Sequence, residues 1–376
     1  MRQYEEVFFS ILRTAMWGVP VEIPQGFPDW KYVMKMAKAQ ALQGLVTDVF
    51  LTTPEIVSVL NPKAVERLQE VPLNMMAMHT SLNNTMILIL SALRGAGIEP
   101  VLLKGQGLSL NYPVPQLRQC GDIDLYVGVD NYMKAYDALL PVVTEIDTRS
   151  EAMSGTKHFH AKVGAVYLEV HKYASVLDSS RVNRIYQRYE SEGLSKGLVP
   201  VSFGEVTVNT PAADFNVYYI FHHLWHHFLT SGIGFRHFCD LALLLHARHG
   251  SIDLAYLEKV LTDMGEMVPW QVLGCVMVDV LGLPQDEFPF YDASQRGKVD
   301  HLLEIIIREG NFGHETAYQR GSGYGFISGK LHSLRFNIRR ISNVAKIFPR
   351  EMASRFYYML VGGTARAFKE FFARVS

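Results

Sequence analysis

The residues that decide the fold are two stretches, LLKGQGLSLNYPVPQLRQCGDIDLYV at 102–127 and YLEVHKY at 167–173. Both contain short apolar runs broken by single polar residues, a pattern that predicts strands. Successive side chains of a strand point to opposite faces, so Asp122 and Asp124 share one face of the first strand. By the same rule Tyr167, Glu169 and His171 share one face of the second. Each predicted strand therefore has a polar face with acidic side chains and an apolar face.

The acidic side chains of these two strands predict a cation site. Two carboxylates about 7 Å apart along one strand repel each other unless a cation lies between them. A glutamate among apolar residues, such as Glu169, also needs a cation or a hydrogen-bond network. If the strands are neighbours in a sheet, Asp122, Asp124 and Glu169 converge on ligands for two divalent ions and a nucleoside triphosphate. The alternative is a solvated sheet face that ends in a turn.

The turn before the first aspartate is a candidate phosphate site. Lys104, Gly105 and Gly107 follow a short apolar strand. Glycines let backbone N–H groups approach phosphate oxygens, and a lysine adds a point charge. The alternative is an ordinary turn between a strand and a helix. Arg118, four residues before Asp122, either clamps a phosphate or pairs with a carboxylate.

Periodicity divides the chain into three parts. Residues 1–95 predict helices with an interruption at Pro72, residues 96–210 mix strands and helices, and residues 211–376 predict helices again. The central strands are predicted within 98–105, 122–130, 157–173 (two strands around a turn at Gly164) and 204–211, with a helix over 131–142. The predicted fold class is α+β. A small mixed sheet is flanked by an N-terminal helical segment and a C-terminal helical domain, with a cleft between the last two.

The composition excludes several classes of protein. Apolar residues make up 48 % of the 376 residues and charged residues 19 %, which excludes a disordered chain. The net charge of −1 excludes a globally basic nucleic-acid coat protein. Three cysteines are too few for a disulfide framework. No apolar stretch is long enough to span a bilayer and no signal-peptide pattern begins the sequence, so we expect a cytoplasmic protein without membrane partners. The oligomeric state is not indicated.

Four histidines in FHHLWHHF, at 221–228, form two pairs at helical spacing. His222 lies four residues before His226, and His223 four before His227, so the two pairs face different directions. Such pairs can chelate zinc, which leaves a zinc hydrolase as one hypothesis. No glutamate lies within the motif, so it is not the metalloprotease pattern. The alternatives are a structural role at the domain boundary and a single histidine facing the cleft.

The segment GIGFRHFCDLALLL, at 232–245, places Arg236 four residues before Asp240. This spacing favours an ion pair within one helix. The functional alternative is that Arg236 reaches a triphosphate or orders the joint between the two parts. His171, on the strand face of Glu169, is a further candidate that would position a metal ligand.

The C-terminal residues 330–376 carry ten Lys or Arg and two acids, a net charge of +8 against −9 for the rest of the chain. Aromatic residues are interleaved with these charges, a combination that binds RNA in some proteins. The spacing is equally typical of amphipathic helices with a solvated basic face. The glycine-rich segment at 310–329 predicts a loop or hinge before this region.

The quoted stretches resemble the nucleotidyltransferases of the DNA-polymerase-beta-like superfamily. More narrowly, they are similar to a bacterial uncharacterised nucleotidyltransferase family whose members show L-K-G, then Tyr and Arg, then D-I-D-L, and later E-[LV]-H. That family in turn resembles abortive-infection toxin nucleotidyltransferases. The resemblance is strongest over 98–175 and weaker over 222–245. It departs at Gly105-Gln106, where the superfamily has Gly-Ser, so the serine hydroxyl is missing unless Ser109 substitutes.

The resemblance implies transfer of a nucleoside monophosphate from an NTP, such as ATP, to an acceptor hydroxyl, with Mg²⁺ or Mn²⁺ as cofactor. The implied metal ligands and catalytic residues are Asp122, Asp124 and Glu169, and the implied nucleotide-binding residues are Lys104, Gly105, Gln106 and Arg118. The acceptor stays open among small molecules, proteins and RNA. The departure at Gln106 keeps a second hypothesis in view, a nucleotide-binding sensor or scaffold with weak catalysis.

Overall fold

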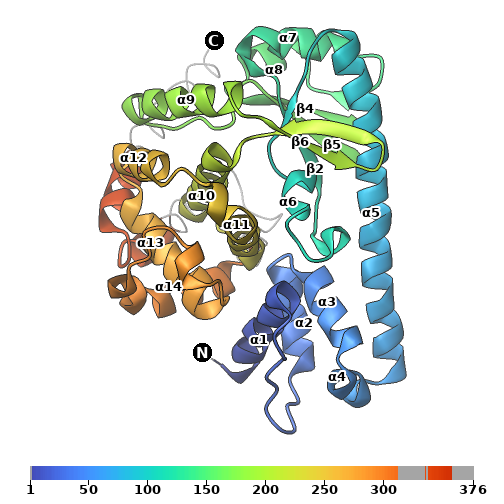
Figure 1. The fold of residues 1–376 in the computed structure, drawn as a ribbon, viewed down its shortest axis with the longest axis vertical. Coiled ribbons are helices and arrows are strands. Elements are labelled where there is room, and N and C mark those ends of the chain that lie inside the picture. The colour runs from blue at the N-terminus through green and yellow to red at the C-terminus, as the bar shows by residue number, and fades with distance from the viewer. Residues whose placement is uncertain (1, 312–334, 336–337, 358–376) are drawn as a thin grey trace.

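The computed structural model describes residues 2–311, 335 and 338–357. One sheet lies beside the long helix α5, and helices α9 to α14 lie on the other side of it (Figure 1). Most of the glycine-rich segment 310–329 and of the basic segment 330–376 lies outside the described residues. Among the residues that the structure describes, no helix is both long and apolar enough to cross a membrane.

Helices account for most of the chain, and their bounds follow its three predicted parts. The first part contains α1 (Gln3–Trp17), α2 (Trp30–Ala39), α3 (Gln43–Thr52), α4 (Pro54–Val59) and α5 (Pro62–Gly95). The central part contains α6 (Gln106–Ser109), the 3₁₀ turn Pro115–Leu117, α7 (Gly128–Leu139), α8 (Arg149–Ser154) and α9 (Ser180–Ser195). The last part contains α10 (Ala213–Thr230), α11 (Phe235–Arg248), α12 (Leu254–Met264), α13 (Met267–Cys275) and α14 (Val299–Glu309). Shorter turns are 3₁₀ at His249–Ser251, Gln285–Glu287 and Ala293–Lys298, and π at Val276–Val280.

The strands form one mixed sheet, which confirms the α+β class. They are β1 (Val101–Leu102), β2 (Asp122–Tyr126), β3 (Glu145–Ile146), β4 (His158–Val163), β5 (Val166–His171), β6 (Val199–Phe203) and β7 (Val206–Thr210). Their order is β3-β4-β5-β2-β1-β7-β6. β2 pairs in parallel with β5 and antiparallel with β1. The expected turn at Gly164 joins β4 to β5, with its φ at 59° in the region that favours glycine.

The apolar face of the central strands is buried against helices. Ile123 and Leu125 of β2 and Leu168 of β5 are at most 1 % exposed, and they share a core with Met86 and Ile89 of α5. Because side chains alternate along a strand, this burial turns the acidic residues of β2 and β5 to the opposite face. That face looks toward α10 and α11 (Figure 1).

The N-terminal helices share a second core with the C-terminal helices. Phe9 of α1 packs edge-on against Phe235 of α11, with ring centroids 5.0 Å apart. Gln40, after α2, is fully buried; its side-chain oxygen accepts from the Phe235 N–H at 3.0 Å and its side-chain amide donates to the Ile306 carbonyl at 3.3 Å. The two ends of the described chain are therefore tied together by apolar packing and by one buried amide.

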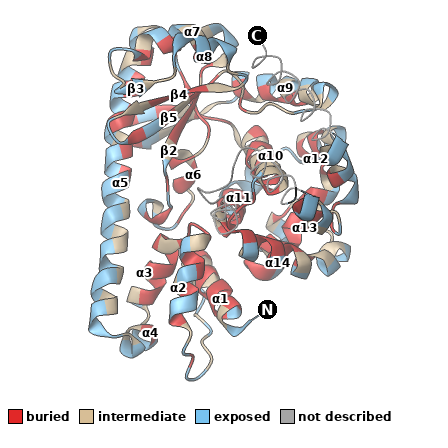
Figure 2. Cartoon of the chain, turned by 180° about the vertical axis from the view of Figure 1, so that it is seen from behind, coloured by how far each residue is buried: buried red, intermediate tan, exposed pale blue. Residues whose placement is uncertain are grey.

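The expected interruption at Pro72 is wrong, because α5 continues through this residue for 34 residues. Proline removes one N–H from the helix and leaves the carbonyl of Leu68 without its usual partner. Around this turn most helix residues are exposed or half-buried, so water can reach the carbonyl. Figure 2 shows the exposed stretch of α5 in pale blue. Apolar residues of the later turns, from Leu82 to Leu93, then hold the helix against the sheet.

A buried ion pair joins the central part to the helical part, and it corrects the pairing expected within α11. Arg118 donates from Nε to Asp240 Oδ1 at 2.7 Å and from Nη2 to Asp240 Oδ2 at 2.8 Å, and both side chains are 4 % exposed. Tyr112 donates to the same carboxylate at 2.6 Å. Burial raises the pKa of Asp240, but Arg118 lowers it more, so the pKa lies below its usual value. Arg236 instead donates to the Gln119 carbonyl at 2.7 Å.

Replacing Asp240 with Asn should lower the free energy of unfolding by about 3 to 5 kcal/mol, because it leaves the Arg118 charge buried without its counter-ion. Urea unfolding followed by circular dichroism measures this loss. Asp137→Asn is the matched control, because it breaks the pair of Asp137 with Arg149, whose side chains are both more than half exposed. An exposed pair contributes at most about 1 kcal/mol. Equal losses in the two variants would contradict the role assigned to Asp240.

Glu190 of α9 caps the loop that follows β5. Its carboxylate accepts from the backbone N–H groups of Ala174 at 2.9 Å and Ser175 at 3.2 Å, and the residue is 2 % exposed. Burial raises its pKa to about 7, against the lowering effect of these two bonds and of Lys157. A carboxyl whose pKa is higher in the folded chain binds more protons there. The folded state therefore loses stability as pH rises from about 4.5 to 7.

Glu190→Gln should remove this pH dependence, because the amide accepts the same two bonds and does not ionise. Relative to the variant, the wild-type protein should lose about 3 kcal/mol of unfolding free energy between pH 4.5 and 7.5. Urea midpoints measured across this range for both proteins give the difference, in which other titrating groups cancel. Parallel stability curves for the two proteins would show that Glu190 ionises normally.

Candidate active site

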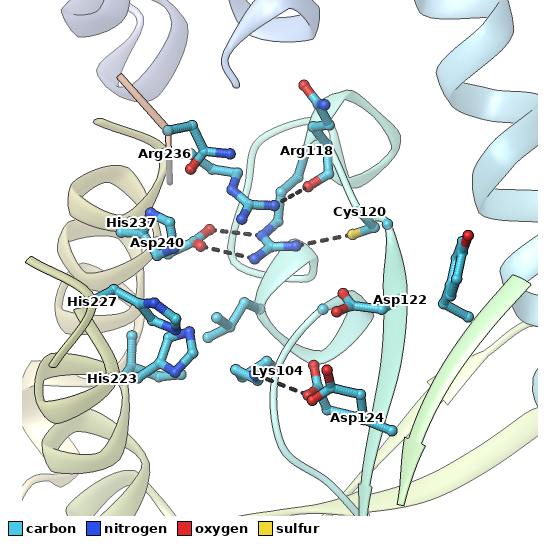
Figure 3. Close-up of a pocket in the computed structure, with 18 of the residues that line it drawn as sticks. Lys104, Arg118, Cys120, Asp122, Asp124, His223, His227, Arg236, His237 and Asp240 are labelled. Carbon is cyan, nitrogen blue, oxygen red and sulfur yellow. Dashed lines mark hydrogen bonds and ion pairs between the residues drawn. The ribbon is translucent and has the colours of Figure 1, made fainter. Parts of the chain in front are cut away.

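A cavity of about 600 Å³ lies between the polar face of the sheet and helices α10 and α11. Its sheet side includes Asp122, Asp124 and Glu169, and its helical side includes His223 and Arg236. In Figure 3 the two aspartates of β2 face the histidines of α10 across this space, with Lys104 between them. The sequence placed the cleft between these same two parts of the chain.

The three acidic residues converge because β2 and β5 are direct neighbours. In the parallel register Asp124 lies opposite Glu169, and Asp122 lies opposite Tyr167. All four side chains belong to the polar face, since residues two apart on a strand share a face. The condition set from the sequence, that the two strands lie side by side, is therefore met.

Asp124 is the most deeply buried of the three acids, at 1 % exposure. Its Oδ1 lies 2.9 Å from Lys104 Nζ and 3.0 Å from His171 Nε2. Burial raises the pKa of Asp124, but Lys104 and then His171 lower it further, so this carboxyl is ionised. Burial lowers the pKa of Lys104, yet the charge of Asp124 outweighs it and the pKa is raised. The pair is a fully charged ion pair at the floor of the cavity.

Asp122 and Glu169 provide negative charge that no protein cation neutralises directly. Asp122 has no hydrogen bond or ion pair to any residue in the described part of the chain, and burial and Asp124 raise its pKa. The Glu169 carboxyl has its pKa lowered to about 2, because hydrogen bonding by His171 outweighs burial. An unpartnered carboxylate beside two ionised ones is an arrangement that a divalent cation stabilises. These residues therefore fit a metal ion.

The turn after β1 brings Lys104 against β2. Gly105 has φ 58° and ψ −119°, and a Cβ atom there would lie 3.3 Å from the Asp122 carbonyl, so the position requires glycine. Gly105 lines the cavity. The side chain of Gln106 does not line it: this residue is fully buried, and neither amide atom has a hydrogen-bond partner in the described structure. Ser109 donates to the Gln106 carbonyl at 2.7 Å and is turned away from the cavity as well.

Two further cations line the cavity. Lys157, just before β4, and Arg236 of α11 have no carboxylate within ion-pair distance among the described residues. Burial and then the charge of Lys104 lower the pKa of Lys157. The Arg236 Nε is buried without a hydrogen-bond partner in the same described set. Arg118 also lines the cavity, but its guanidinium is held by Asp240 (Figure 3). Lys157 was missed from sequence because a lone lysine before a strand carries no local signal.

The histidines of α10 divide between two directions, as their spacing predicted. His223 and His227 line the cavity together with His237 of α11. Burial lowers the pKa of His223 well below its usual value and that of His227 to about 4, so both rings are neutral. His222 instead lies 2.9 Å from Glu266 through its Nδ1. Within the described ranges, the four histidines do not bring together three ligand atoms for a metal, which does not support the zinc hydrolase hypothesis.

A third histidine group on β4 was missed from sequence. His158 Nδ1 lies 3.6 Å from Glu169 Oε2, and His160 Nε2 lies 3.8 Å from Glu169 Oε1. Burial lowers the pKa of His158 to about 4. The alternation His-Phe-His at 158–160 was the available signal, because it places both rings on one face of a strand. His171, expected to position a ligand, contacts both Asp124 and Glu169.

Comparison with known proteins assigns the chain to a family. Residues 28–268, more than half of the chain, match the model of a family described as uncharacterised nucleotidyltransferase. No curated protein and no solved structure matches. The matched range includes the whole sheet, the turn at Gly105, the acidic residues and helices α10 and α11. The chain belongs to the uncharacterised nucleotidyltransferase family.

Proposed function

We propose that this protein is a metal-dependent nucleotidyltransferase that transfers the monophosphate of an NTP to an acceptor hydroxyl. One observation carries the proposal: the pairing of β2 with β5 sets Asp122, Asp124 and Glu169 on the cavity face. Family membership supports the same class of reaction. Cations from both sides of the cavity add the positive charge that a triphosphate needs.

The three carboxylates are the residues that would hold a divalent ion such as Mg²⁺ or Mn²⁺. Asp122 is the unpartnered ligand, and Asp124 and Glu169 are ionised. When bound, the ion would neutralise phosphate charge and lower the pKa of the acceptor hydroxyl. The ammonium of Lys104 keeps Asp124 ionised and in place before any substrate arrives.

The remaining cations are suited to the phosphates. Lys104 and the backbone at Gly105 lie on the sheet side, and Arg236 lies on the helical side. Lys157 adds a charge next to β4. Arg118 acts at one remove, since its pairing with Asp240 fixes the loop that precedes β2 and the helix that carries Arg236.

In the proposed reaction the acceptor oxygen attacks the α-phosphorus and forms a P–O bond. The bond from the α-phosphorus to the bridging oxygen breaks, and pyrophosphate leaves with its electron pair. The hydroxyl proton passes to Glu169, which is free to accept it because its pKa is about 2 and its side chain is about one quarter exposed. The acceptor class is a small molecule, a protein or an RNA.

A second candidate function is nucleotide binding with little turnover. Neither Gln106 nor Ser109 places a side chain in the cavity, so no hydroxyl from this turn reaches a terminal phosphate. A sensor or scaffold would bind NTP and release it unchanged. Incubation with α-labelled NTP, Mg²⁺ and a panel of acceptors separates the two, since only the enzyme leaves label on an acceptor.

Asp122→Asn should abolish transfer while leaving the fold intact. The substitution removes a charge that makes no hydrogen bond or ion pair to the described residues, so thermal stability should stay equal or rise. Loss of one charged group at the reacting centre should reduce labelling by about 100-fold or more. Asp286→Asn, at an exposed 3₁₀ position, is the matched control. Wild-type labelling by the folded Asp122 variant would remove the basis of the proposal.

Lys157→Gln and Arg236→Gln should each weaken NTP binding. A charge-assisted contact to phosphate contributes about 1.5 to 3 kcal/mol, so the Kd for a non-hydrolysable NTP should rise at least about tenfold. Isothermal titration calorimetry measures the Kd. Lys31→Gln, on the exposed face of α2, should leave it unchanged. If neither cavity variant changes the Kd, the phosphates do not lie between these two cations.

A further inference from the structure

A chain of side chains leads from the end of β3 into the cavity. The Asp147 carboxylate accepts from the His160 backbone N–H at 2.8 Å and lies 3.1 Å from His160 Nδ1. His160 Nε2 lies 3.0 Å from His158 Nε2. His158 Nδ1 then faces Glu169 Oε2 at 3.6 Å. The chain therefore ends at the third carboxylate of the proposed active site.

The bond partners assign the tautomers of both rings. A carboxylate only accepts hydrogen bonds, so His160 carries its proton on Nδ1, toward Asp147. The Nε2 of neutral His160 is then an acceptor, and His158 must donate from its own Nε2. This leaves the lone pair of His158 Nδ1 turned toward Glu169. The atom is buried and has no hydrogen-bond partner among the residues described here.

The resulting arrangement lacks a cation. A nitrogen lone pair and an ionised carboxylate oxygen repel each other at 3.6 Å, and nothing in the described chain lies between them to bond both. His171 Nε2 approaches the same Glu169 oxygen to 3.3 Å, and its side chain is fully buried. His158, Glu169 and His171 each offer one ligand atom, and these atoms lie within 4.8 Å of one another. They form the one such set of three His, Cys, Asp or Glu residues found in the described ranges.

We propose that His158, Glu169 and His171 bind a divalent transition-metal ion of the Zn²⁺ or Co²⁺ class, with the His160–Asp147 pair positioning the His158 ring. Two imidazole nitrogens and one carboxylate are ligands that suit such ions, whereas Mg²⁺ prefers oxygen ligands alone. A carboxylate that orients a ligating histidine through its other ring nitrogen is a common support of metal sites. Here that support passes through a second histidine.

The site gives the proposed enzyme two kinds of metal position. The Asp122 side offers oxygens alone, and the His158 side offers nitrogens, with Glu169 shared between them. The inference rests on the proposed function for what the ion would do next to an NTP, but not for its binding. Binding can therefore be measured without nucleotide and without turnover.

The test uses the full chain stripped of metal and titrated with Co²⁺, whose visible d–d absorption reports binding and coordination by imidazole. We expect one Co²⁺ per chain, displaced by stoichiometric Zn²⁺ and retained in a large excess of Mg²⁺. His158→Gln should weaken Co²⁺ binding at least about tenfold, and Asp147→Asn roughly 10- to 100-fold through the loss of ring positioning. His249→Ala, an exposed histidine outside the cavity, is the control and should bind as wild type.

Wild-type Co²⁺ affinity in folded His158→Gln would overturn the inference, and so would displacement by Mg²⁺ as easily as by Zn²⁺. Asp147→Asn provides an independent arm if the His158 variant does not fold, because Asp147 contacts no ion: wild-type affinity there would remove the positioning role. The two proposals fail separately. Co²⁺ binding that depends on His158, without any transfer of label, sustains the metal site and overturns the enzyme. Transfer that depends on Asp122, with Co²⁺ binding independent of His158, does the reverse.

Discussion

The parallel pairing of β2 with β5 gathers like charges that would otherwise repel each other. It is held by apolar residues on the opposite face, such as Ile123 and Leu168, which pack under α5 and α7. Burial of that face turns the carboxylates toward the cavity, and only part of their charge is balanced by protein. Lys104 compensates Asp124, while Asp122 is left without a partner in the described structure. The core thus stabilises an electrostatic arrangement that is unfavourable until a cation binds.

The width of the cavity depends on a different contact. Arg118 and Asp240 form a buried pair across the two sides, and Tyr112 adds a third bond to the same carboxylate. Charges buried in this way have a strong directional requirement, because each unsatisfied bond costs more than in water. The helices that carry His223 and Arg236 therefore stand at a fixed distance from the sheet. A rigid wall opposite the acids suits a site whose chemistry is mainly positioning and charge neutralisation.

Much of the sheet and the acidic group could be predicted from sequence, because a period of two identifies the faces of a strand. Alternation in DIDLYV and YLEVH placed Asp122, Asp124 and Glu169 on polar faces, and the two directions of the α10 histidines followed from helical spacing. Periodicity does not name neighbours, however. Local spacing favoured Arg236 as the partner of Asp240, whereas tertiary packing brought Arg118 from 122 residues away. β3 has two residues and β6 contains Pro200, so neither shows a strand pattern. At Pro72 solvent satisfied what the lost hydrogen bond left open.

The packing of α1 against α11 also bears on how the chain is made. Phe9 meets Phe235 only after 225 further residues have been synthesised, which at ribosomal rates takes roughly 10 to 45 s. Until then the apolar sides of the first three helices have no partner from the C-terminal half. The central sheet, whose contacts are nearer in sequence, can condense in the meantime. The nascent chain thus carries a waiting apolar surface at its leading end, which makes this protein a natural client for chaperones that shield such surfaces during translation.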